Sequence, residues 1–181
     1  MLYKFDGKTP RVSKTAYISE TATVIGDVTI GDNCYIGHGA ILRGDYGRIV
    51  IEYGTAVEEG AIVHAPPNEE NRIKDQVTIG HNAVIHGAVI EKMAVVGMGA
   101  ITSLWSEIGE GAIIAEGGVV KARQIVPPMV VAAGNPVKIV REVSEKDTEF
   151  WRWGKKLYIE LAERYIQHPM EPVTAVYPPS D

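Results

Sequence analysis

An aliphatic residue recurs every six positions along most of this chain. The spacing first runs from Ile18 to Leu42, resumes at Ile51, and returns from Ile90 to Val126. A helix buries residues three and four positions apart, and an ordinary strand buries every second residue. A period of six instead predicts a short straight side followed by a corner, and three such sides close one coil of a parallel β-helix. We therefore expect an all-β solenoid built from hexapeptide repeats.

The repeat is interrupted at three places. Nine residues separate Leu42 from Ile51, sixteen separate Val63 from Ile79, and eleven separate Ile79 from Ile90. We therefore expect extra residues near the stretch RGDYGR, a protruding loop around residues 66–75, and a slip of register between 79 and 90. Breaks in a solenoid are where loops and functional sites tend to be placed.

A helix is predicted after the repeat fades beyond Val126. Ser144 and Asp147 form a capping-box-like start, and apolar residues then recur at helical spacing. The residues expected to face the solenoid are Phe150, Leu157, Tyr158, Leu161, Ala162 and Tyr165. The predicted organisation is a β-helix domain over residues 1–140, a C-terminal helix over 141–168 packed on it, and a flexible tail over 169–181.

Composition and charge exclude several classes of function. The net charge is −5 and the basic residues are scattered, so nucleic acid is not an expected partner. The single cysteine, Cys34, forms no internal disulfide, which suits a reducing compartment. No apolar run approaches the ~18 residues that would span a membrane. We expect a cytoplasmic protein with no membrane partner.

Three histidines, His64, His81 and His86, fall at the register breaks. His64 and His86 are twenty-two residues apart, so a loop of about four residues beyond one coil would stack them on adjacent coils. Three neutral imidazoles are a standard ligand set for catalytic zinc. His81 should lie around a corner, and a second subunit in a three-fold ring could supply it. The alternative is that all three are simply packed, as expected for His38.

The segments RGDYGRIVI, AIVH, VTIGHNAVIHGAVI, VVAAGNPVKIVREV and LYIELAERY together resemble the γ-class carbonic anhydrase family, nearest the branch with proteins of carnitine and phenylacetate operons. The resemblance implies a left-handed parallel β-helix and a homotrimer with a metal at each interface. The implied ligands are His64, His86 and the neighbouring chain's His81, with Zn²⁺ as the metal and Fe²⁺ or Co²⁺ as alternatives. The implied reaction is reversible hydration of CO2 to bicarbonate by a zinc-bound hydroxide.

The resemblance also carries over to residues around the metal. Arg43 and Asp45 are expected beside the site, where they help hold the trimer together. Glu58 and Glu59 stand where the family has Gln-Asp, so Glu58 is either protonated, turned away, solvated at the coil edge, or a cause of weak turnover. Tyr158 matches a helix tyrosine that reaches the site in some relatives, and the alternative is that it only packs against the solenoid.

Two other functions remain open from the sequence. One is an acyl-CoA thioesterase or acyltransferase, for which Lys121, Arg123, Lys138 and Arg141 could bind the phosphates. The other is a non-catalytic trimer in which the metal is structural.

Overall fold

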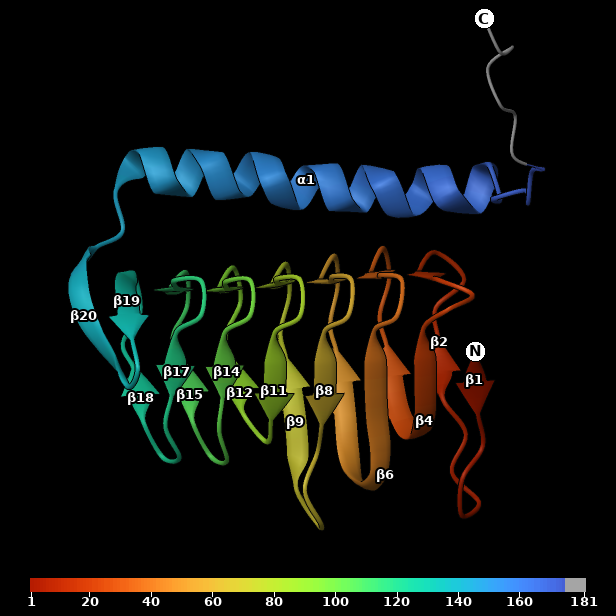
Figure 1. Cartoon of the computed structure of the whole chain (residues 1–181), viewed down its shortest axis with the longest axis horizontal. Coiled ribbons are helices and arrows are strands. Elements are labelled where there is room, and N and C mark those ends of the chain that lie inside the picture. The colour runs from red at the N-terminus through yellow and green to blue at the C-terminus, as the bar shows by residue number, and fades with distance from the viewer. Residues whose placement is uncertain (175–181) are drawn as a thin grey trace, which may run out of the picture.

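The chain winds into a solenoid of stacked three-sided coils, with one helix laid along its length (Figure 1). The computed structural model describes residues 1–174. Strands on successive coils pair in parallel, and only the last pair is antiparallel. The predicted solenoid of hexapeptide repeats with a C-terminal helix is confirmed.

The first side of the coils, here called the histidine face, starts at the N-terminal half of β6 and continues through four shorter strands. Its strands are β6 (Ile41–Ile51), β8 (Ile62–His64), β11 (Val84–His86), β14 (Ile101–Thr102) and β17 (Val119–Val120). The second face starts from the C-terminal half of β6. It continues through β9 (Glu70–Ile73), β12 (Val89–Ile90), β15 (Glu107–Ile108) and β18 (Ile125–Val126).

The third side, here called the helix face, is an eight-stranded sheet that lies beneath the helix. Its strands are β3 (Tyr17–Ile18), β5 (Tyr35–Ile36), β7 (Ala56–Val57), β10 (Thr78–Ile79), β13 (Val95–Val96), β16 (Ile113–Ile114), β19 (Val130–Gly134) and β20 (Val137–Glu142). At the N-terminal end, β1 (Leu2–Tyr3) and β2 (Arg11–Val12) pair with β4 (Thr23–Ile30).

The core is a column of the aliphatic residues that define the repeat. Leu42, Ile51, Val63 and Ile90 are essentially fully buried, and small residues such as Ala61 fill the corners. The interior is therefore mainly aliphatic, and its burial is the main source of stability.

The predicted loop over residues 66–75 is partly wrong. Residues 70–73 form β9, which pairs with both β6 and β12. Asn71 and Ile73 point inward and are fully buried, so this segment completes a coil and only residues 65–69 connect it to β8. A polar residue in an inward position concealed the strand from the repeat pattern.

The helix α1 (Glu145–Gln167) begins with the predicted capping box, in which Ser144 and Asp147 exchange hydrogen bonds. Residues 141 and 142 still belong to β20, so the helix starts later than the predicted boundary of 141. Its expected apolar face is partly wrong, because Phe150 is 56% exposed and Leu157 is 41% exposed.

The side chains that α1 buries completely are those of Lys155 and Ala162. The helix is thus rotated toward a mixed polar and aromatic stripe. Residues 169–174 of the predicted tail have no regular structure, and the remainder lies outside the described residues. Across residues 1–174, no helix is both long and apolar enough to cross a membrane.

Candidate metal centre

His64 and His86 lie side by side at the end of the histidine face. They are register partners on β8 and β11, and their rings stack with centroids 5.1 Å apart and planes 15° apart. This is the adjacent-coil arrangement that the spacing predicted. Because side chains alternate along a strand, His64 projects from the same outer surface as Ile62, and His86 from the same surface as Val84.

The Nε2 atom of His64 is the strongest indication of a ligand site. This atom is buried and has no hydrogen-bond partner among the described residues. Asp45 Oδ1 lies 3.5 Å away, which is within ion-pair distance but does not form a hydrogen bond. Burial and the neighbouring Arg43 guanidinium lower the pKa of His64, which favours the neutral imidazole that metals require. His64 and His86 are therefore two candidate metal ligands that one chain places side by side.

Arg43 and Asp45 stand beside His64 and form an ion pair with each other. Arg43 is the register partner of His64 on β6, and its Nη1 donates to Asp45 Oδ2 at 2.7 Å. Burial raises the pKa of Asp45, but the hydrogen bonds from Arg43 and from the backbone N–H of Tyr46, together with the charge of Arg43, outweigh burial and lower the pKa overall. The pair forms within one chain, so Asp45 is an ionised neighbour of the candidate ligand.

His81 lies at the other end of the histidine face, in the corner between β10 and β11. Both ring nitrogens face carboxylates: Nδ1 is 2.8 Å from Glu59 Oε2, and Nε2 is 3.2 Å from Glu58 Oε2. Tyr35 donates from its hydroxyl to Glu59 Oε1 at 2.6 Å, which fixes that carboxylate. Glu59 thus orients His81 in the manner of the carboxylates that support metal-binding histidines.

One chain does not bring the three histidines together. Within residues 1–174 no group of three or more histidine, cysteine, aspartate or glutamate side chains could hold a metal ion. The geometry agrees with the sequence argument that His81 lies around a corner from His64 and His86.

Of the alternatives that the sequence left open for Glu58, a solvated carboxylate at the coil edge is wrong. Glu58 is only 5% exposed, and its Oε2 accepts a hydrogen bond from the backbone N–H of His81 at 3.1 Å. Burial raises the pKa of Glu58, although His81 and Tyr158 act in the opposite direction. Tyr158 on α1 interacts with the Glu58 carboxylate, and burial raises the pKa of its phenol. The structure therefore brings Glu58, Glu59 and Tyr158 to His81, and Arg43 and Asp45 to His64.

An apolar column occupies the outer surface between the two groups of histidines. Ile41, Ile62, Val84, Ile101 and Val119 are aligned by strand register on the histidine face. Ile62 and Ile101 are each 39% exposed. Aligned exposed isoleucines on a sheet are typical of a surface that another chain covers.

Two functional neighbours were missed from the sequence. Asn71 donates from Nδ2 to the carbonyl of His64 at 3.3 Å, from a fully buried position. Lys155 is buried beneath α1, where its Nζ donates to Thr78 Oγ1 and to the carbonyl of Ala94, each at 3.1 Å. The sequence could have indicated Asn71 only through its position, because it is a polar residue where the repeat places an inward-facing aliphatic one.

The fold and repeat place this chain in the hexapeptide-repeat transferase family, and residues 9–44 match the family description "Bacterial transferase hexapeptide (six repeats)". A protein of Geobacillus kaustophilus named "Carbonic anhydrase" is 37% identical over 165 residues, which are 91% of each chain. The "Carnitine operon protein CaiE" of a Proteus species is 36% identical over 176 residues, 96% of this chain and 89% of that protein.

Two solved structures share the whole architecture. A Bacillus cereus protein described as a candidate acetyltransferase superposes with a TM-score of 0.91 at 32% identity, covering 92% of this chain and 97% of that one. A hexapeptide transferase family protein from Anaplasma phagocytophilum superposes with a TM-score of 0.88 at 33% identity, covering 91% and 98%. The chain is thus related both to proteins named carbonic anhydrase or CaiE and to proteins named as transferases.

Proposed function

We propose that this chain is a carbonic anhydrase-like metalloenzyme that interconverts CO2 and bicarbonate at the interfaces of a homotrimer. The observation that supports it best is the buried, unpartnered Nε2 of His64 beside His86. The apolar column supports a covering subunit, and a three-fold head-to-tail contact across it would bring a neighbour's His81 to this pair.

The residues present have defined tasks in this proposal. His64 and His86 from one chain and His81 from the next would hold Zn²⁺, with Fe²⁺ or Co²⁺ as alternatives. A bound zinc ion supplies a water molecule with a pKa near 7 and therefore a hydroxide nucleophile at neutral pH. Glu59 holds Nδ1 of His81, which leaves Nε2 for the metal.

Glu58 has a second role because it faces that same Nε2 at 3.2 Å. The carboxylate must give way when His81 binds a metal. In the position that faces His81, burial raises the pKa of Glu58, and its carboxyl group lies beside the proposed metal site, where it would exchange protons with the reacting atoms. The Arg43–Asp45 pair supplies an ordered carboxylate on the other side, 3.5 Å from His64 Nε2.

The test is metal content per chain, measured beside stopped-flow CO2 hydration on the same sample purified without chelator. We expect about one metal per chain and loss of both metal and hydration in His81→Ala. His38→Ala is the matched control, because His38 bonds Ser19 instead of the candidate ligands. Absence of metal in a correctly assembled trimer would contradict the proposal.

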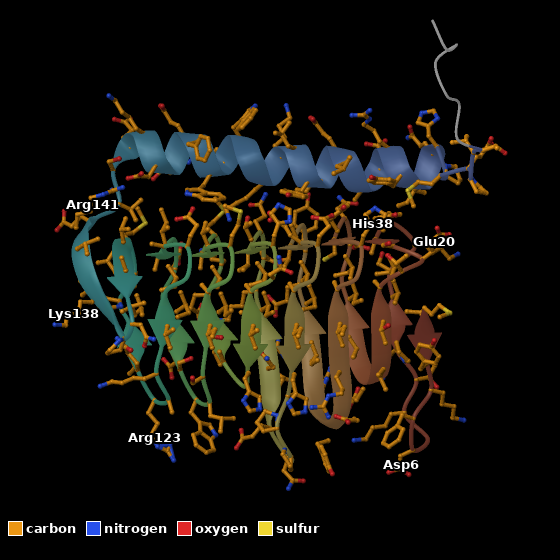
Figure 2. All side chains as sticks on the ribbon, viewed as in Figure 1. Asp6, Glu20, His38, Arg123, Lys138 and Arg141 are labelled. Atoms are coloured by element: carbon orange, nitrogen blue, oxygen red, sulfur yellow. The ribbon has the colours of Figure 1, made fainter. Side chains whose placement is uncertain are left out.

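A second candidate function is chemistry on an acyl-CoA. The similarity to structures described as transferases favours it. The basic residues expected to bind CoA are not gathered in one place: Figure 2 shows Arg123 at the coil edge away from the helix, and Lys138 and Arg141 near β20. Arg141 is already paired with Asp147, and Arg123 stacks 4.1 Å above the ring of Trp105.

A calorimetric titration with CoA separates the two functions. Binding of CoA at micromolar concentration, with weaker binding in Arg123→Ala, would favour chemistry on an acyl-CoA. Metal at full occupancy with neither hydration nor CoA binding would favour a trimer in which the metal is structural.

A further inference from the structure

A cavity of about 250 Å³ opens between α1 and the edge of the helix face, directly beside His81. Its apolar wall includes Met98, Phe150 and Leu157, which are 51%, 56% and 41% exposed. Glu58 and Glu116 also line it. At about 30 Å³ per water in the liquid, the cavity has room for about eight waters. This is far more space than the three atoms of CO2 need.

The helix keeps this cavity open at Gly154. A side chain added at Gly154 would meet only the ring edge of Trp151, at 3.9 Å, which is an ordinary contact. The other lining glycines differ, because a Cβ at Gly80 or Gly97 would lie 2.8 or 2.7 Å from a backbone atom of the next coil. Those two glycines are required by coil stacking. Glycine at position 154 lowers the helix propensity, and no close packing contact requires it there. The effect of this glycine that the structure shows is therefore the open space of the cavity.

The charges around the cavity select against anions. Its lining, as far as the described residues show it, contains two carboxylates and no lysine or arginine. Lys155 lies nearby on α1, but its Nζ is directed to Thr78 and to the carbonyl of Ala94. An anion placed here would face the side chains of Glu58 and Glu116, which is unfavourable in a partly desolvated site. The basic side chain in the lining, His81, already has its two ring nitrogens against Glu58 and Glu59.

We propose that this cavity binds an uncharged molecule with an apolar body of about the size of one aromatic ring. His81 is one of the residues that line the cavity, so the cavity adjoins the proposed metal site, and this placement beside a metal rests on the proposed function. Binding in the cavity itself requires only one chain and is separate from the hydration of CO2. Phe150, Leu157 and Gly154 are then specificity-determining residues.

The test uses benzamide and benzoate, which match in size and differ in charge. Binding is measured by ligand-observed NMR on the His86→Ala variant, so that it does not depend on the metal. We expect benzamide to bind at least about tenfold more tightly than benzoate, and Glu116→Gln to narrow this preference. Equal binding of the two ligands, or binding of neither, would overturn the proposal.

Variants at Gly154 distinguish a binding role from a structural one. Gly154→Leu should weaken benzamide binding at least about tenfold without lowering the midpoint of thermal unfolding, since leucine is the better helix former. Glu160→Leu adds the same side chain at an exposed helix position that does not line the cavity, and should leave binding unchanged. Unchanged binding in Gly154→Leu would contradict the assignment. If the unchanged protein takes up no metal but its chain binds benzamide, the proposed function is refuted and the ligand class of the cavity stands.

Discussion

At the scale of single residues, Asn71 is the unusual member of an aliphatic core. Its Nδ2 bonds the carbonyl of His64 across the connection that contains Pro66 and Pro67, neither of which has a backbone N–H to donate. Its Oδ1 is buried without a partner among the described residues, and such a group costs about 1–3 kcal/mol. Asn71 therefore positions His64 at the expense of fold stability.

This account predicts opposite effects for Asn71→Leu. The free energy of unfolding without metal should stay the same or rise by about 1 kcal/mol, because an unsatisfied polar group is removed. Metal affinity should fall about tenfold, because the His64 carbonyl loses the hydrogen bond from Asn71 and keeps only the one from the backbone N–H of Gly87. Chemical denaturation and a competition titration with a chelator measure the two quantities.

The matched control is Thr102→Val, which removes another buried, unpartnered oxygen from the core. Thr102 has no contact with the histidines among the hydrogen bonds of the described chain. We expect a similar gain in stability and unchanged metal affinity. A parallel loss of metal in both variants would show that Asn71 acts only through general packing.

The sequence predicted the positions of His64 and His86 because the repeat fixes which residues on successive coils are neighbours. It did not predict that Glu58 is buried, and it placed Tyr158 near the site only through the family resemblance. The contact between the two depends on how the helix that carries Tyr158, 100 residues further along the chain than Glu58, is rotated on the solenoid, and no local pattern specifies that rotation. Phe150 and Leu157 were misassigned for the same reason.

At the scale of elements, α1 buries a lysine that the predicted apolar face of the helix did not include. Lys155 is 2% exposed, and burial lowers its pKa to about 7. A lysine in the unfolded chain has a pKa of about 10.4, so between these values the unfolded state binds a proton that the folded state does not. Stability should therefore rise with pH from 7 to 10, and should not change further from this source below pH 7.

Comparison with Lys155→Met isolates this effect. Relative to the variant, the unchanged protein should gain on the order of 3 kcal/mol of unfolding free energy between pH 7 and 10. Urea denaturation at several pH values measures the difference. The control is Lys156→Met, because the Lys156 side chain is 74% exposed. Its unfolding free energy should change with pH in the same way as that of the unchanged protein. If the difference in unfolding free energy between the unchanged protein and Lys155→Met does not vary from pH 7 to 10, the folded and unfolded states bind the Lys155 proton equally in this range, and the account is refuted.

At the scale of the whole molecule, the apolar column on the histidine face is the surface that the proposed trimer would bury. Ile62 lies near its centre, so Ile62→Glu should place a charge in a desolvated interface and shift the mass in analytical ultracentrifugation from trimer to monomer. Ile125→Glu is the control, because Ile125 is 66% exposed on the second face, away from the column. Dissociation in both variants, or in neither, would count against this interface.

The same geometry predicts complementation between two inactive chains. His81→Ala keeps His64 and His86, whereas His64→Ala keeps His81, so each variant alone lacks a complete site in every interface. When the two are co-expressed equally and assemble at random, about three quarters of the trimers are mixed, and each mixed ring has one complete interface of three. Metal content should therefore recover to about a quarter of the unchanged protein. Recovery requires ligands from two chains, so a mixture that stays metal-free while forming normal trimers would refute the shared site. A pair of variants on the same side, His64→Ala with His86→Ala, should not recover and serves as the control.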